Sequence, residues 1–63
     1  MLYLSDLLIR HREVASFREL TALVRRYAEE GERFLGMDIK PDFQDTPRNW
    51  EFLLESAFMW GER

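Results

Sequence analysis

Apolar residues recur every three to four positions in the middle of the chain, the spacing of one face of an α-helix. The recurring positions are Phe17, Leu20, Val24, Tyr27, Gly31 and Phe34. Ser16 and Glu19 match a capping box, in which the serine accepts a hydrogen bond from the N3 amide and the glutamate reaches back to the cap. The pattern predicts a helix over residues 17–35. Gly31 leaves two interpretations open, a close helix crossing or a helix that ends early at Glu30.

The start of the chain also has a helical pattern. At about 100° per residue one face carries Leu4, Leu7, Leu8, His11 and Val14. Ser5 is a suitable N-cap, so we predict a helix over about residues 6–14. The alternative is an N-terminal strand over residues 2–4, which we favour less because no second strand is evident downstream.

A third helix is predicted over residues 47–60, because Thr46 and Pro47 are a favoured pair at the N-cap and first helical positions. Gly61 is typical of the C′ position, just beyond the end of a helix. Its main apolar face carries Trp50, Leu53, Leu54, Ala57 and Trp60.

Residues 36–46 form the one long connection, in which Pro41 stops a helix. We expect Ile39 and Phe43 to pack into the core and hold this segment as an ordered loop. The predicted fold is all-α: a compact three-helix domain that spans residues 1–63.

The third helix is apolar on more than one side. Phe52 and Met59 are seven residues apart, so they lie on one line of the helix away from its main apolar face. Phe58 falls at the opposite edge. A bundle of this size has one core, so a further apolar side needs a second surface to meet. The predicted partner-binding residues are Phe52, Met59 and Phe58 with a polar rim of Glu51, Glu55 and Arg48.

Composition narrows the classes of function. The chain has 63 residues, close to the lower size limit for a domain that folds alone, and it has no cysteine and one histidine, His11. We expect no disulfide and no metal site, so stability must come from packing or self-association. No apolar run approaches the roughly 20 residues that span a bilayer. We expect a cytoplasmic protein that does not bind membranes.

No nucleophile elbow, phosphate loop or dinucleotide fingerprint is present, so we expect no enzyme, no cofactor and no small-molecule substrate. The predicted function is a protein-protein interaction module (a regulator, adaptor or inhibitor), with a homodimer through the third helix as one form.

Two alternatives remain open. The first is a nucleic-acid-binding regulator, whose candidate phosphate contacts are Arg10, Arg12, Arg25 and Arg26. The net charge of −3 argues against nucleic-acid binding as the main activity. The second is a structural subunit of a larger complex.

Overall fold

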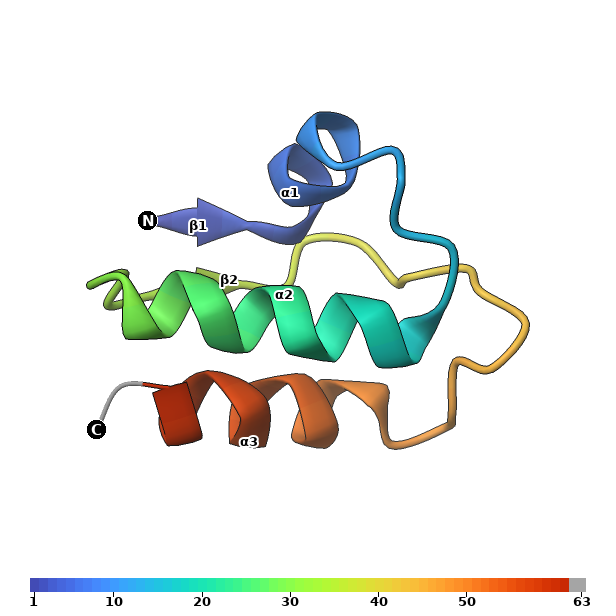
Figure 1. Cartoon of the computed structure of the whole chain (residues 1–63). Helices are drawn as coiled ribbons and strands as arrows, with labels where there is room; N and C mark the ends of the chain where they lie inside the picture. The colour runs from blue at the N-terminus through green and yellow to red at the C-terminus, as the bar shows by residue number, and fades with distance from the viewer. Residues whose placement is uncertain (62–63) are drawn as a thin grey trace.

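Five elements make up the part of the chain that the structure, a computed structural model, describes: residues 1–61. In chain order they are β1 (Leu2–Tyr3), α1 (Leu4–Arg10), α2 (Phe17–Glu29), β2 (Leu35–Gly36) and α3 (Trp50–Gly61). α2 lies between α1 and α3, and α2 and α3 run in the same direction (Figure 1). The predicted three-helix architecture is confirmed in outline, but the fold is not purely α-helical.

The two strands pair in parallel, with Leu2 opposite Leu35 and Tyr3 opposite Gly36. The strand that the alternative placed at residues 2–4 is therefore present over Leu2–Tyr3, but it precedes a helix and does not replace it. The expectation that no second strand exists was wrong. The second strand lies where the sequence pattern placed the last turn of a helix. Gly36 leaves room for the Tyr3 ring, because a Cβ at this position would lie 2.5 Å from a carbon of that ring.

α2 begins as predicted. The Ser16 side chain accepts a hydrogen bond from the Glu19 amide at 3.1 Å. The Glu19 carboxylate, however, accepts from the amide of Ala15 at 3.2 Å, one residue before the cap. The local sequence therefore places the first turn of this helix correctly, with a small difference in how the glutamate is used.

α2 ends at Glu29 and does not continue to residue 35 as predicted. Gly31 has a φ of 108°, a conformation that side chains other than glycine rarely adopt. The Gly31 amide donates to the Ala28 carbonyl and the Glu32 amide donates to the Tyr27 carbonyl, both at 3.1 Å. These two bonds make a Schellman motif, which ends the helix. Of the two interpretations of Gly31, early termination is the correct one.

Both ends of α1 differ from the prediction of residues 6–14, because the helix begins earlier and already ends at Arg10. α1 begins at Leu4, and its N-cap is Tyr3, which makes no side-chain capping bond. Ser5 is inside the helix, and both its amide and its hydroxyl donate to the carboxylate of Asp38. The residue predicted to cap α1 thus ties it to the loop after β2.

The start of α3 also differs, because the helix begins at Trp50 and not at residue 47. The Thr46 hydroxyl accepts from the Phe43 amide at 3.0 Å, and the Thr46 amide donates to the Phe43 carbonyl at 3.1 Å. Thr46 therefore closes a turn in the loop and does not cap the helix.

The core lies around α2. Its buried apolar residues are Leu2, Leu4, Leu7, Phe17, Leu20, Val24, Ala28, Leu54 and Phe58. Phe43 packs against this core as predicted, whereas Ile39 and Phe34 are exposed, contrary to prediction. None of the helices in residues 1–61 has the length and apolar character needed to cross a membrane.

Candidate protein-interaction surface

α3 has apolar side chains on two opposite sides. Leu54 and Phe58 are buried in the core, and Gly61 is buried on the same side of the helix. Phe52, Met59 and Trp60 keep 67%, 61% and 54% of their surface exposed. The prediction that Trp60 lies on the main apolar face was therefore wrong, because the core-facing side of α3 runs along the three buried residues and Trp60 falls outside it. Helical geometry puts residues 52, 56 and 59 on one line, so the exposed residues form a stripe along the outside of the helix. The structure therefore places Phe52 and Met59 on the surface, as the predicted site requires.

Phe58 is a correction to the predicted site, because it is only 6% exposed and belongs to the core. The reason is the segment around β2, which was not foreseen. Leu35 and Met37 of this segment pack against the core and share a hollow with Phe58. They cover the side of α3 that a bundle of three long helices would leave open.

Phe34 is a surface residue that sequence reasoning missed. It was predicted to lie on the core-facing apolar side of the second helix, but α2 ends before it and leaves it 64% exposed. Phe34 and Met59 line one hollow of about 300 Å³ between α3 and the β2 segment. We use the name α3 surface for the four exposed apolar residues Phe52, Met59, Trp60 and Phe34.

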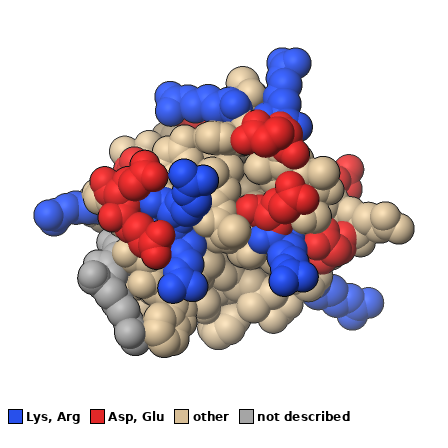
Figure 2. Space-filling view, viewed as in Figure 1, with Lys and Arg blue, Asp and Glu red and all other residues tan. Residues whose placement is uncertain are grey.

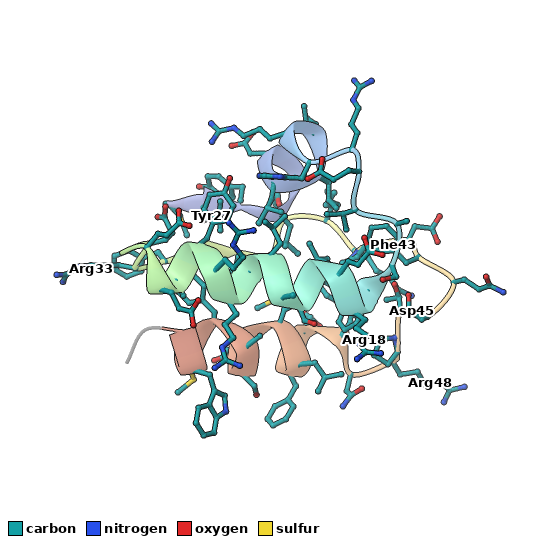
Figure 3. The ribbon with its side chains drawn as sticks, in the orientation of Figure 1. Arg18, Tyr27, Arg33, Phe43, Asp45 and Arg48 are labelled. Atoms are coloured by element: carbon teal, nitrogen blue, oxygen red, sulfur yellow. The ribbon has the colours of Figure 1, made fainter. Side chains whose placement is uncertain are left out.

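One border of the α3 surface is acidic. Glu51 and Glu55 are exposed one turn apart on the same side of α3, and Glu55 lines the hollow together with Arg33. Within residues 1–61 neither glutamate makes an ion pair. Arg48, the third predicted rim residue, lies in the turn before α3 and extends away from the molecule (Figure 3).

The other border is basic. A groove of about 400 Å³ separates the outer sides of α2 and α3. The residues that line it are Arg18, Thr21, Ala22, Arg25, Arg26, Glu29, Ala57 and Trp60. Arg18 lies at the start of α2, over the beginning of this groove (Figure 3). Arg25 is paired with Glu29, with 3.5 Å between Nε and Oε2.

The four arginines of the nucleic-acid hypothesis do not form one strip. Arg10 ends α1 and Arg12 follows it, while Arg25 and Arg26 lie on α2. Carboxylates lie among them: Arg26 shares a small hollow with Glu13 and Glu30. On the face in Figure 2, basic and acidic side chains alternate over the surface.

The same small hollow contains a chain of three polar side chains. His11 Nδ1 lies 3.0 Å from Glu13 Oε2, and His11 Nε2 lies 2.8 Å from the Tyr27 hydroxyl. Hydrogen bonds from its own backbone amide and from His11 hold the pKa of the Glu13 carboxyl below its usual range. The His11 and Tyr27 rings also meet edge-on, with centroids 5.7 Å apart. This chain joins the end of α1 to α2.

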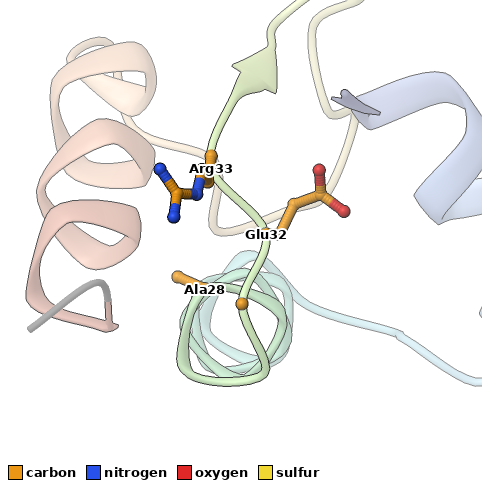
Figure 4. A pocket seen from close by; sticks show the side chains of 4 residues that line it. Ala28, Glu32 and Arg33 are labelled. Carbon is orange, nitrogen blue, oxygen red and sulfur yellow. The ribbon is translucent and has the colours of Figure 1, made fainter.

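A further hollow, of about 380 Å³, lies beyond the end of α2. Arg33 points toward α3 in this hollow and Glu32 points to the opposite side (Figure 4). The two charged groups therefore do not converge on a shared ligand position. Within residues 1–61, moreover, no three His, Cys, Asp or Glu side chains are grouped so that they could hold a metal ion.

Comparison with protein-family models, with curated proteins and with solved structures finds no significant match for this chain.

Proposed function

We propose that the chain is a non-enzymatic protein-protein interaction module, a small regulator, adaptor or inhibitor, that binds its partner through the α3 surface. One observation carries the proposal. A helix that already packs one side into the core keeps three large apolar side chains on the other side more than half exposed. Contiguous exposed apolar patches of this kind mark interaction sites in soluble proteins.

The composition of the surface supports binding to a protein. Phe52 and Trp60 are aromatic anchors, and charged residues border them on both sides. Aromatic anchors inside a charged rim are the usual arrangement of an interaction hot spot. Full burial of a phenylalanine or methionine contributes about 1.5–3 kcal/mol, so covering Phe52 and Met59 would offset part of the cost of association.

The test is site-specific photo-crosslinking in cells that express the chain. A photoreactive phenylalanine analogue replaces Phe52 in one variant and Ile9, an exposed residue of α1, in a matched control. We expect position 52 to give discrete protein adducts that position 9 does not give. Absence of such adducts at position 52, with the variant folded and expressed, would show that the α3 surface binds no protein.

The arginine-based alternative has less support, because the arginines lie among carboxylates. It makes a different prediction about salt. Binding that depends on arginine-phosphate contacts weakens steeply between low and moderate salt, while binding through an aromatic surface changes little. The other alternative, a structural subunit of a larger complex, would use the same α3 surface.

A further inference from the structure

We propose that a second copy of the chain covers the α3 surface, and that the two α3 helices pack side by side in the same direction. The two-fold axis of this dimer runs along the helices. The inference rests on the proposed function, since it assumes that the α3 surface is a binding surface. It adds the identity of the partner and the orientation in which the partner binds.

Charge on the two borders of the α3 surface carries the inference. The border on the β2 side holds two carboxylates, Glu51 and Glu55, and one guanidinium, Arg33, for a net charge of −1. The border on the α2 side holds three guanidiniums and one carboxylate, for a net charge of +2. Its charged residues are Arg18, Arg25, Arg26 and Glu29. A surface with opposite charges on its two borders can be complementary to itself.

The direction of the second helix decides which borders meet. A two-fold axis along α3 exchanges the borders, so each acidic border faces the basic border of the other copy. A two-fold axis across α3 would make the helices antiparallel and place each border against its own equivalent. Like charges that face one another across an interface cost binding free energy. The charge pattern therefore selects the parallel pair.

The positions along the helices also agree. α2 and α3 run in the same direction (Figure 1), and Arg18, the second residue of α2, lies beside the start of α3 (Figure 3). Arg25 lies level with its end, because a Cβ at Gly61 would meet the Arg25 carbonyl. In a parallel pair without a shift, Glu51 therefore faces Arg18 of the second copy. Glu55, one turn further along α3, lies nearer than Glu51 to Arg25 of the second copy.

The centre of the interface is compatible with close packing. Along the contact line, Phe52 and Met59 are separated by the small side chain of Ser56, and each meets its own equivalent in the second copy. Spacing by seven residues suits the shallow crossing of about 20° at which two helices pack with interdigitated side chains.

Sedimentation equilibrium with charge-reversed variants tests the pairing of Glu51 with Arg18. We expect the wild type to be a reversible dimer, and Glu51→Arg or Arg18→Glu each to raise the dissociation constant roughly threefold to tenfold. The double variant restores the attraction with the charges exchanged, so its constant should return to within about twofold of wild type. Asp42→Arg, the same charge change in a loop away from α3, is the matched control and should have no effect.

Disulfide trapping tests the orientation. Because the chain has no cysteine, an introduced cysteine is the only thiol that can form a disulfide. In the parallel pair, oxidised Met59→Cys protein forms a disulfide-linked dimer by itself. In an antiparallel pair it does not, and only a mixture of the Phe52→Cys and Met59→Cys proteins links. A dimer that forms only in that mixture would overturn the proposed orientation.

Two outcomes separate this inference from the proposed function. A wild type that stays monomeric up to about 1 mM, while position 52 still crosslinks to another protein in cells, overturns the second copy and leaves the interaction function standing. A dimer that persists unchanged in the Phe52→Glu, Met59→Lys variant, with no crosslinks at position 52, overturns both.

Discussion

Two loop aspartates hold distant parts of the chain together through single carboxylates. Asp45 accepts hydrogen bonds from the Phe17 amide at 2.7 Å and from the Arg18 amide at 3.2 Å, so it caps α2 from the loop that precedes α3. Asp38 accepts from the amide and hydroxyl of Ser5. Free amides at a helix N-terminus need acceptors, and a negative charge there is favourable. We infer that both contacts depend on the ionised carboxylate.

The first prediction is a loss of stability in acid. The Phe17 amide holds the pKa of Asp45 below its usual range, and the Ser5 hydroxyl does the same for Asp38. A carboxyl whose pKa is lower in the folded chain stabilises the fold above its unfolded pKa, and this contribution disappears as the pH falls through the folded pKa. We therefore expect the free energy of unfolding to fall below about pH 4.

Urea denaturation between pH 2 and pH 6 measures this effect. The Asp38→Asn, Asp45→Asn variant should be less stable at neutral pH and should depend less on pH in the acid range. Asp42→Asn is the control, because within residues 1–61 Asp42 makes no hydrogen bond through its side chain. A double variant with the same pH profile as wild type would show that these carboxylates are not the groups responsible.

The second prediction concerns Tyr27. Its hydroxyl bonds His11 and its ring packs against the His11 ring. Tyr27→Phe keeps the ring and removes the hydrogen bond, so we expect a loss of about 0.5–1.5 kcal/mol of stability, while Tyr27→Ala should lose more. Chemical denaturation measures both variants. Equal losses for the two would mean that ring packing contributes nothing.

At the scale of the element, α3 carries a matched pair of phenylalanines. Phe58 is buried and Phe52 is exposed on the same helix. We expect Phe58→Ala to cost about 3–5 kcal/mol of stability, and Phe52→Ala to cost under about 0.5 kcal/mol at concentrations where the chain is monomeric. Denaturation of both variants at low protein concentration measures the difference. Comparable losses would place Phe52 in the core and remove the α3 surface.

Gly61 marks the close crossing of α2 and α3. A Cβ at this position would lie 2.7 Å from the Cβ of Ala28 and would also meet the Arg25 carbonyl. Backbone atoms cannot move aside easily, so we expect Gly61→Ala to destabilise the fold by about 1–3 kcal/mol, although alanine is the better helix former. Ser56→Ala on the same helix is the control. Thermal unfolding distinguishes them, and a stabilised Gly61→Ala variant would contradict the close crossing.

Gly31 and Gly61 have different structural roles that the sequence could not distinguish. Sequence spacing placed Gly31 on the apolar seam and Gly61 after the last helix. The structure gives Gly31 the role of ending α2 and Gly61 that of the close contact. A glycine ends a helix or permits a crossing equally well on chemical grounds. Only the position of the neighbouring helix decides between the two roles.

At the scale of the whole molecule, the path of the chain between α2 and α3 explains why Phe34 and Ile39, which were predicted to pack into the core, are exposed. Because the two helices are parallel (Figure 1), the chain must return along the full length of α2 before α3 begins. β2 pairs with β1 on this return path. The return segment covers Phe58 and leaves Phe34 and Ile39 outside the core.

A prediction at this scale follows from the proposed dimer. Binding that is restricted to the folded state raises the thermal midpoint with concentration. We expect the midpoint of the wild type to rise as protein concentration increases, and that of the Phe52→Glu, Met59→Lys variant to stay constant. Differential scanning calorimetry over a hundredfold range of concentration tests this. A constant wild-type midpoint would contradict self-association in that range.

The sequence alone determined the features that depend on neighbouring residues. The cap at Ser16, the helical character of the three segments and the apolar excess of α3 all follow from spacing and side-chain chemistry. Only the tertiary structure decided where α2 ends, that residues 2–3 and 35–36 pair, and which phenylalanine of α3 is buried. These features depend on segments far apart in the chain, and periodicity within one segment carries no information about what packs against it.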